Sequence, residues 1–345
     1  MPISLDKDPI GSFDTLQDHL KKYVKSAFST NSKTFEKDRQ SLLDTPGVLF
    51  QEPFIELLPA YKSGKQLKDI DSLVLPSMPQ EAIKAFQAIA GASLIPGEMN
   101  LYEHQEKMLS KALGKNRKHC VVVTGTGSGK TEAFLLPVIA SIIKEAKKKW
   151  TAPNQPKENW PLKIKWNSSR QEIRKETRSP AVRALLLYPM NALVEDQMSR
   201  LRATLDSDEA HEAMDQELDG NRIRFGRYNG STPVAGHPSK FDLKKNMWVN
   251  SPKRLQLQTK IKEARNEYED HKKQVAGARG ELDLAKAAYD QARIKNAEEN
   301  LSALNDQSEY IPRFETGACE MFHRWEMQAT PPDLLITNVS MLSIM

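Results

Sequence analysis

The segment VVVTGTGSGKT, residues 121–131, constrains the fold of this chain more than any other stretch. Three consecutive β-branched residues from Val121 predict a buried parallel strand, and residues 132–146 have the apolar spacing of an amphipathic helix. The glycines between them allow a tight turn whose backbone N–H groups point inward at the positive end of the helix dipole. This combination predicts a polyphosphate site; the alternative is a glycine-rich turn that binds nothing.

Two side chains of this loop carry the predicted chemistry. Lys130 is expected to reach β- and γ-phosphate oxygens, and the hydroxyl of Thr131 is expected to coordinate the Mg²⁺ that bridges them. Both are candidate catalytic residues, and Thr131 is the candidate metal ligand. The candidate phosphate-binding residues are Thr124, Gly125, Thr126, Gly127, Ser128, Gly129, Lys130 and Thr131.

Composition limits the classes of protein to which the chain can belong. Its 345 residues, 39% of them hydrophobic, suffice for about two globular domains. Cys120 and Cys319 are the only cysteines and lie far apart, which predicts a reducing cytoplasm and neither a disulfide framework nor a zinc site. Neither a signal peptide nor an apolar run of about 18 residues is apparent, so we predict a cytoplasmic chain that does not cross a membrane.

The loop sequence TGTGSGKT resembles the first motif of superfamily 2 (DEAD/DEAH-type) helicases, where a small residue, here Thr124, replaces the first glycine of the Walker A pattern. The resemblance implies that ATP and Mg²⁺ bind. It also makes Gln105, in LYEHQ, the reader of the adenine edge, because a side-chain amide is both donor and acceptor. Tyr102 is a candidate for stacking on the base. The alternative for Gln105 is a polar residue on the exposed face of a helix over 103–113.

A second strand and helix follow, in VRALLLYPM (182–190) and NALVEDQMSRLRATL (191–205). Two strand–loop–helix units in succession predict right-handed crossovers and a RecA-like α/β fold with a parallel sheet. The segment around residues 189–197 resembles the second helicase motif. The resemblance implies that this segment, residues 221–236 and residues 337–338 bind nucleic-acid phosphates without reading the base sequence. The candidate nucleic-acid-binding residues are Pro189, Asn191, Gln197, Arg227, Ser231, Thr232, Thr337 and Asn338. A plain hairpin loop remains the alternative for residues 221–236.

Charge is concentrated in residues 144–183, which hold twelve lysine or arginine residues against four glutamates, a local balance of +8. Trp150, Trp160 and Trp166 are interleaved with this charge. We treat residues 147–181 as a basic insertion. It suits a single strand of nucleic acid, held by phosphate contacts and indole stacking, but a solvated insertion whose tryptophans pack on a neighbouring domain fits equally well.

Residues 250–305 are predicted to form a coiled-coil-like insertion. Tyr268, Val275, Leu282 and Tyr289 recur every seven residues, with alanines in a companion position. A continuous helix of this length would rise about 75 Å, so we predict a helical hairpin that turns at residues 277–280, where two glycines lie. Its partner is nucleic acid or another subunit, or its charged surface is simply solvated.

The resemblance defines the predicted domains. Residues 1–95 form a mainly helical accessory region, in which GVLFQEPFIELLPAYKSGKQL is similar to the lead-in of very large bacterial phage-defence helicases. Residues 96–345 resemble the first RecA-like motor domain of Druantia-type and DISARM-type antiphage helicases, in an incomplete form. Those families couple ATP hydrolysis to translocation on DNA.

The catalytic acid motif of superfamily 2, Asp-Glu-x-His, is expected to be missing from the chain, as is Asp-Glu-x-Asp. The nearest acidic runs, at 206–209 and 215–219, also lack a preceding apolar strand. Two hypotheses follow. The first is the N-terminal, ATP-binding part of a DNA helicase or translocase of antiphage defence. Its predicted partners are DNA, single-stranded or duplex with a single-stranded region, and other defence-system subunits. The second is a truncated nucleotide-binding module that binds DNA or a partner without hydrolysis.

The charge balance of residues 144–183 generates a prediction. If this segment contacts single-stranded phosphates, the affinity should fall with salt with a log–log slope near −0.7 per contact, because each contact releases counterions. A salt titration of oligonucleotide binding measures the slope. A flat titration would mean that the segment is only a surface insertion.

Overall fold

The computed structural model describes residues 9–28, 30, 32–45, 47–51, 60–95, 99–114, 118–125, 127–154, 174–242, 244–315 and 317–344. The chain divides into two compact units, Met1–Ala60 and Tyr61–Met345. The first unit contains helices α1 (Pro9–Ala27) and α2 (Lys33–Leu43), and α2 begins where the Ser32 side chain accepts a hydrogen bond from the Phe35 N–H. The division therefore falls at Ala60, before the predicted boundary at residue 95.

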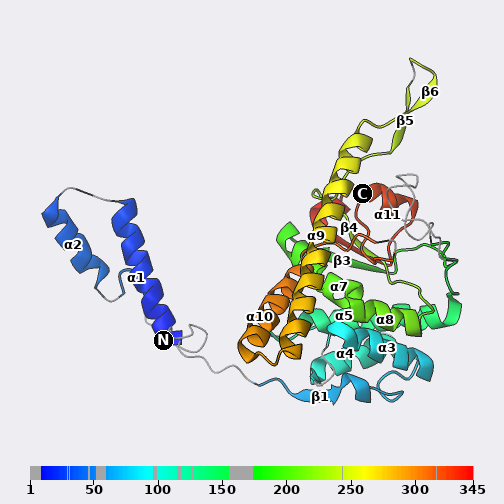
Figure 1. The fold of residues 1–345 in the computed structure, drawn as a ribbon, viewed down its shortest axis with the longest axis horizontal. Coiled ribbons are helices and arrows are strands. Elements are labelled where there is room, and N and C mark those ends of the chain that lie inside the picture. Colours follow the sequence, from blue (N-terminus) through cyan, green and yellow to red (C-terminus); the bar gives the residue numbers. More distant parts are fainter. Residues whose placement is uncertain are drawn as a thin grey trace. The chain divides into compact units, whose positions relative to one another are not determined.

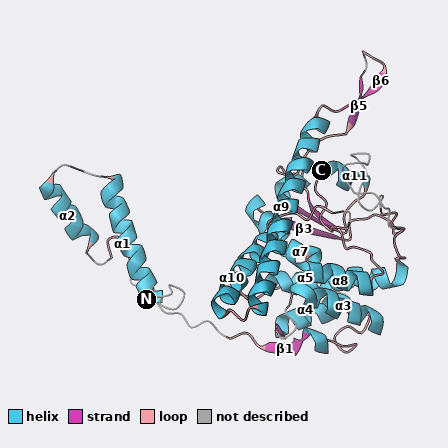
Figure 2. Cartoon of the chain, in the orientation of Figure 1, coloured by secondary structure: helices cyan, strands magenta, loops and turns pink. Residues whose placement is uncertain are grey.

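The second unit is an α/β assembly (Figure 1, Figure 2). Its strands are β1 (Ser63–Gln66), β2 (Asn100–Tyr102), β3 (Ala184–Tyr188), β4 (Phe225–Arg227), β5 (Ser239–Asp242), β6 (Met247–Asn250) and β7 (Leu334–Asn338). Its helices are the short 3-10 helix Leu67–Asp69, α3 (Gln80–Ser93), α4 (Glu103–Leu113), α5 (Lys130–Lys149), α7 (Asn191–Asp206), α8 (Asp208–Glu217), α9 (Lys253–Ala287), α10 (Gln291–Ser308), α11 (Arg324–Ala329) and α12 (Val339–Leu342).

A three-stranded parallel sheet in the order β3-β7-β4 lies at its centre. The alternation of side chains across a strand gives each face its own contacts. Leu334 and Ile336 of β7 belong to the main core, which also includes apolar residues of α7, whereas Leu335 packs with Met321 and Met327 on the α11 side. The predicted parallel sheet flanked by helices is thus present.

A cluster of charged side chains joins the beginnings of the three strands. Asp333, directly before β7, is 1% exposed, and its carboxylate accepts a hydrogen bond from the backbone N–H of Arg224 at 2.7 Å. It also pairs with Arg183 at 2.8 Å and with Arg178 at 2.9 Å. Because Arg183 precedes β3 and Arg224 precedes β4, one carboxylate connects all three strands.

Helices form the rest of the core. Helix α7 packs on the sheet, α3 packs against α5, α7 and α8, and α5 packs against α4 (Figure 1). Their apolar faces share one cluster that includes Phe86, Leu109, Leu135 and Met198. The predicted helices at 103–113, 132–146 and 191–205 all belong to this layer.

The predicted strand at Val121–Val123 is not formed. Residues 118–125 carry no strand, and Val121 and Val123 are 89% and 88% exposed. A strand requires a hydrogen-bonded neighbour, and no described strand pairs with this segment. In β3, Leu185 and Leu187 are each 45% exposed, so these side chains are not covered by the valines of residues 121–123 either. β-branched composition alone therefore does not create the strand here.

The long insertion consists of α9 and α10, which pack side by side (Figure 1), but the turn is not where the sequence predicts it. Helix α9 continues through Gly277 and Gly280. Each glycine costs about 1 kcal/mol relative to alanine, which is small beside the interactions of a 35-residue helix. The turn lies at Ala288–Asp290. There Tyr289 adopts a left-handed φ of 54°, and the Asp290 side chain caps α10.

The contact between the two helices uses small residues. Ala278, Ala285 and Ala297 are buried, whereas the heptad residues Val275 and Leu282 are only half-buried. Two of the predicted companion alanines, Ala278 and Ala285, therefore lie in the contact, but the third, Ala292, is exposed and Ala297 of α10 is buried instead.

Glu315 attaches α9 to the body of the unit. Its carboxylate accepts hydrogen bonds from the Tyr268 hydroxyl and the Lys272 ammonium group, both at 2.7 Å, and pairs with Arg313 at 3.3 Å. Partial burial alone would raise the pKa of Glu315, but the hydrogen bonds from Lys272 and Tyr268 and the charge of Arg313 lower it to about 2. The carboxylate therefore stabilises the fold only while it is ionised.

We predict that Glu315→Gln lowers the free energy of unfolding by about 1–2 kcal/mol at neutral pH, after a discount for partial exposure. The stabilisation is fully present above the ordinary glutamate pKa and disappears as the pH falls through the folded-state value. Urea unfolding at several pH values measures the difference, with the exposed Glu281→Gln on α9 as the control. A difference that stays constant down to about pH 2 would contradict this account.

Candidate functional site: a phosphate-binding loop and the carboxyl edge of the sheet

The glycine-rich loop has the backbone that a phosphate site requires. Gly127 and Gly129 adopt left-handed φ angles of 73° and 70°, and Gly129 is the residue before the first turn of α5. A side chain at position 129 would be strained and would also meet Gln105, since a Cβ there would lie 2.4 Å from its Nε2. The sequence predicts these glycines correctly as conformational requirements. Thr126 lies outside the described residues.

Polar groups of the loop contact one another. The Lys130 ammonium group donates to the carbonyl oxygens of Thr124 at 3.0 Å and Gly125 at 2.5 Å. The Thr124 and Ser128 hydroxyl oxygens are 2.6 Å apart, and Ser128 is fully buried. The positive charge of Lys130 is therefore held over the loop, at the beginning of α5, where the helix dipole adds to it.

Gln105 connects α4 to the loop. It is 3% exposed; its Nε2 donates to the carbonyl oxygen of Gly129 at 3.0 Å, and its Oε1 accepts from the backbone N–H of Tyr102 at 2.8 Å. It is therefore not the exposed helix residue of the alternative hypothesis. Its amide is already engaged on both sides, so in this conformation it positions the loop. The Tyr102 ring stacks on that of His104, at 5.6 Å between centroids.

The loop opens onto a cavity of about 840 Å³. Thr131 and Lys130 line it, as do Gln105 and Tyr102, so the structure brings together the predicted base and phosphate residues. Sequence reasoning missed several lining residues, namely Ser63, Gln66, Leu94, Ile95, Met99, Asn100, Glu132 and Arg200. Ser63 and Gln66 belong to β1, within a proline- and glycine-interrupted stretch that predicts no regular structure. Arg200 of α7 reaches the cavity through its ion pair with Glu132 at 3.0 Å.

A second constellation lies where the parallel strands end. Asn191 follows β3, Asn338 ends β7 and Asn229 follows β4. The Asn191 Oδ1 accepts from the Asn338 Nδ2 at 2.6 Å and from the Asn229 Nδ2 at 3.3 Å. Two of these residues are predicted; Asn229 is not, although its place directly after a strand was a usable signal. The carboxyl edge thus carries a connected cluster of three amides.

The other predicted nucleic-acid residues divide by exposure. Pro189 and Ser231 are exposed at this edge. Thr232, Thr337 and Gln197 are at most 4% exposed. The Thr232 hydroxyl donates to the carbonyl oxygen of Arg227 at 2.8 Å, and that of Thr337 donates to the carbonyl oxygen of Tyr228. These buried side chains shape the edge and do not face a ligand in this conformation.

Two further predicted residues are paired within the protein. The Tyr188 hydroxyl donates to the Gln197 Oε1 at 2.6 Å, which fixes Gln197 beneath the surface. Arg227 forms an ion pair with Glu195 of α7. A phosphate would have to compete with this carboxylate for the guanidinium group.

The basic segment is partly structural. Trp150 is 8% exposed and lies under the guanidinium group of Arg178, at 4.0 Å from the ring centroid. Arg174 and Arg178 are buried around Glu176, at 3.2 and 3.3 Å. For these residues the packing alternative holds. Residues 155–173, with Trp160 and Trp166, lie outside the described part of the chain.

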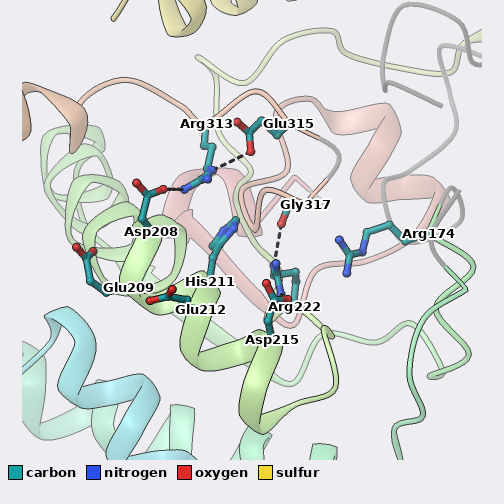
Figure 3. Close-up of a pocket in the computed structure, with 10 residues that line it drawn as sticks. All are labelled: Arg174, Asp208, Glu209, His211, Glu212, Asp215, Arg222, Arg313, Glu315 and Gly317. Carbon is teal, nitrogen blue, oxygen red and sulfur yellow. Dashed lines mark hydrogen bonds and ion pairs between the residues drawn. The ribbon is translucent and has the colours of Figure 1, made fainter. Parts of the chain in front are cut away.

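The letters Asp208-Glu209-Ala210-His211 do spell Asp-Glu-x-His, so the expectation that the chain lacks this sequence is wrong. The structure places them on α8, after helix α7 and not after a strand. Asp208, Glu209 and His211 line a separate cavity of about 550 Å³ that shares no residue with the cavity at the loop (Figure 3). Asp208 pairs with Arg313 at 2.8 Å. This sequence therefore does not face the phosphate-binding loop.

Asp206, His211 and Cys319 form a buried group beside this cavity, with ligand-type atoms within 4.8 Å of one another. Each is already engaged. The Asp206 Oδ1 is 2.9 Å from the His211 Nε2, and its carboxylate accepts from the backbone N–H groups of Cys319 and Glu320. The Cys319 thiol donates to the carbonyl oxygen of Leu205, and burial raises its pKa. The group is best described as a hydrogen-bonded core.

Comparison with known proteins bears on both constellations. Residues 102–258 match the DEAD/DEAH box helicase family. The DEAD/DEAH match begins at Tyr102, contains the whole glycine-rich loop and ends in α9; of the predicted site residues, only Thr337 and Asn338 lie beyond it. It implies the predicted RecA-like α/β fold, with which the parallel sheet and its helices agree.

The chain is also 28% identical over 347 aligned positions to Druantia protein DruE of Escherichia coli (strain UMEA 4076-1). The alignment covers 96% of this chain and 16% of the relative's length. These two findings confirm the resemblance to superfamily 2 helicases of defence systems. No solved structure shows significant similarity to the chain. Among the described residues, no helix is long and apolar enough to cross a membrane.

We predict that Lys130→Ala weakens binding of ATP with Mg²⁺ by at least about tenfold, because it removes the side-chain charge and leaves a helix terminus typically worth 0.3–1 kcal/mol. Isothermal calorimetry measures the affinity. Lys111→Ala, on the exposed side of α4, is the matched control and should have no effect. If the Lys130 variant and the unmodified chain bound ATP with equal affinity, the loop would not be part of the nucleotide-binding site.

Proposed function

We propose that this chain binds ATP with Mg²⁺ at the glycine-rich loop and DNA at the carboxyl edge of the sheet, as the ATP-binding part of a helicase or translocase of bacterial antiphage defence. The observation that carries the proposal is the loop itself: two left-handed glycines, the buried Ser128 and Lys130 at the start of α5, open to a cavity of about 840 Å³. The similarity to DruE supports the defence setting.

The residues of the loop fit the nucleotide. Gly129 provides space that any side chain would fill, and the backbone N–H groups at the start of α5 suit phosphate oxygens. Lys130 would exchange its two carbonyl partners for phosphate oxygens, and the Thr131 hydroxyl is a hard oxygen ligand of the kind Mg²⁺ prefers. The metal ion would supply neutralisation of the phosphate charge.

The DNA part of the proposal rests on the amide cluster. Amide groups of Asn191, Asn229 and Asn338 can bond phosphate and sugar oxygens without reading bases, as a motor that moves along any sequence requires. The cluster and the loop are connected through α7, which begins at Asn191 and whose Arg200 pairs with Glu132 in the first turn of α5. We propose a cytoplasmic setting and other defence-system subunits as partners.

The alternative function is a nucleotide-binding module that does not hydrolyse ATP. It is favoured by the placement of the Asp-Glu-Ala-His sequence on α8, away from the loop cavity. A water-activating acid positioned at the phosphates is part of the hydrolysis machinery of this family, and no described carboxylate other than that of Glu132 lines the loop cavity.

We predict that a polypeptide of residues 1–345 binds ATP without appreciable turnover. Mg²⁺ would be held from one side only, and an arginine finger alone is worth about 10³ to 10⁵ in rate. Phosphate release, with and without single-stranded DNA, is compared for this polypeptide and for Lys130→Ala and Glu209→Gln variants. DNA-stimulated release that Lys130→Ala abolishes would contradict the prediction, and its loss in Glu209→Gln would identify α8 as the source of the acid.

A further inference from the structure

Strands β5 and β6 form a two-stranded antiparallel ribbon that projects from the body of the unit (Figure 1). Among the described residues these strands pair only with each other. Phe241 and Trp248 are directly opposite in the register, so both side chains lie on the same face. The ribbon has no part in either constellation above.

The aromatic pair is largely in solvent. Trp248 is 67% exposed and Phe241 is 43% exposed, and their ring centroids are 5.8 Å apart at an interplanar angle of 74°. Neither residue belongs to a core cluster of the described part of the chain. An indole on a small projecting ribbon gains little from packing, so its large apolar face is available to a flat ligand.

The ribbon also carries exposed lysines: Lys244 and Lys245 lie at its tip, and Lys240 lies on the face opposite the aromatic pair. Lys240, Lys244 and Lys245 are exposed, and their ammonium groups form no ion pair with a described residue. The one acidic residue of the ribbon, Asp242, accepts hydrogen bonds from the backbone N–H groups of Lys244 and Lys245 at 2.9 and 3.3 Å. The tip of the ribbon therefore combines a positive charge with an open aromatic face.

The base of the ribbon is fixed to helices α9 and α11. The chain passes from β4 through the loop of Asn229 to β5. The Lys253 ammonium group donates to the carbonyl oxygen of Ala235 at 3.1 Å, and the Trp325 indole N–H donates to that of Gly236 at 2.6 Å. The segment that leads into the ribbon is thus anchored to the start of α9 and to α11.

We propose that the β5–β6 ribbon binds single-stranded nucleic acid, with a base stacked on Trp248 and flanking phosphates held by Lys244 and Lys245 at its tip. The inference rests on the proposed function and adds to it a binding element outside the residues that the family resemblance implies. Only an unpaired strand offers both an open base face and phosphates at short range. The positive tip favours such a polyanion over an apolar protein surface.

The test uses fluorescence anisotropy of labelled oligothymidylate and oligouridylate, and of a blunt duplex, with the full 345-residue chain. Trp248→Ala should weaken single-strand binding by about fivefold to a hundredfold, and Trp248→Phe should retain most of the affinity, because a phenyl ring still stacks. Tyr310→Ala, which removes a 72% exposed aromatic ring elsewhere, is the matched control. The two oligonucleotides show whether DNA or RNA is preferred.

The lysines have their own readout. Lys244→Ala with Lys245→Ala should reduce the log–log salt slope by about 1.4, or about 0.7 for each phosphate contact, whereas Lys295→Ala on α10 should leave it unchanged. Circular dichroism and thermal unfolding establish that each variant is folded, which is expected because the ribbon contributes no core residue.

Several outcomes would overturn the proposal. If Trp248→Ala bound single strands with unchanged affinity, the ribbon would not be a binding element. The proposed function would not be affected by this result. Equal weakening of duplex binding would exclude stacking on an unpaired base. If sedimentation shows that the chain self-associates through Trp248 with no effect on nucleic acid, the ribbon is a protein interface. If the unmodified chain binds no nucleic acid, the DNA part of the proposed function fails as well, whereas calorimetry with ATP still tests the nucleotide part.

Discussion

The carboxylate of Asp333 is the interaction on which the central sheet depends. It receives the backbone N–H before β4, the guanidinium group before β3 and a second guanidinium group from Arg178, while its own backbone continues into β7. A buried carboxylate is costly unless it is paired and hydrogen-bonded, and here all its partners come from segments distant in sequence. A strand out of register by one residue would lose its contact with this buried charge. The same contact therefore selects both the neighbours and the alignment of the three strands.

Fixing the strands at their beginnings also determines what meets at their ends. Parallel strands point the same way, so the residues after β3 and β4 lie near the end of β7. Asn191, Asn229 and Asn338 become neighbours although 147 residues separate the first from the last. Helix α7 connects this edge with the phosphate-binding loop, because it begins at the edge and its Arg200 pairs with Glu132 in the first turn of α5. The two ends of the sheet have different roles: buried ion pairs hold one of them together, and uncharged amides occupy the other.

Local sequence signals predicted much of this arrangement. The helices over 103–113 and 132–146, the strands β3, β4 and β7 and the conformation of the loop glycines follow from periodicity and glycine chemistry. What could not be predicted depends on distant partners. Val121–Val123 has strand composition, but none of the strands that the structure describes pairs with it. Gln105 has an amide suited to adenine that the structure uses for Gly129. The sequence Asp-Glu-Ala-His on α8 is a motif that occurs outside its usual structural context, because it follows a helix and not a strand. The turn of the helical insertion was predicted at the wrong place, because glycine residues only permit a helix to end. The actual turn is formed by Tyr289 in a left-handed conformation and by the Asp290 side chain, which caps α10.

The contacts of Lys130 have a consequence for selectivity. Its ammonium group already satisfies two carbonyl oxygens of its own loop, so ligand binding there is an exchange reaction and not a simple gain. A neutral or singly charged ligand offers the cation little more than the carbonyl dipoles do, and the exchange is then close to balanced. A triphosphate offers several full negative charges, and the ammonium group is attracted more strongly to a full opposite charge than to a carbonyl dipole. The loop thereby discriminates by ligand charge, and it does so with the same side chain that keeps its backbone ordered.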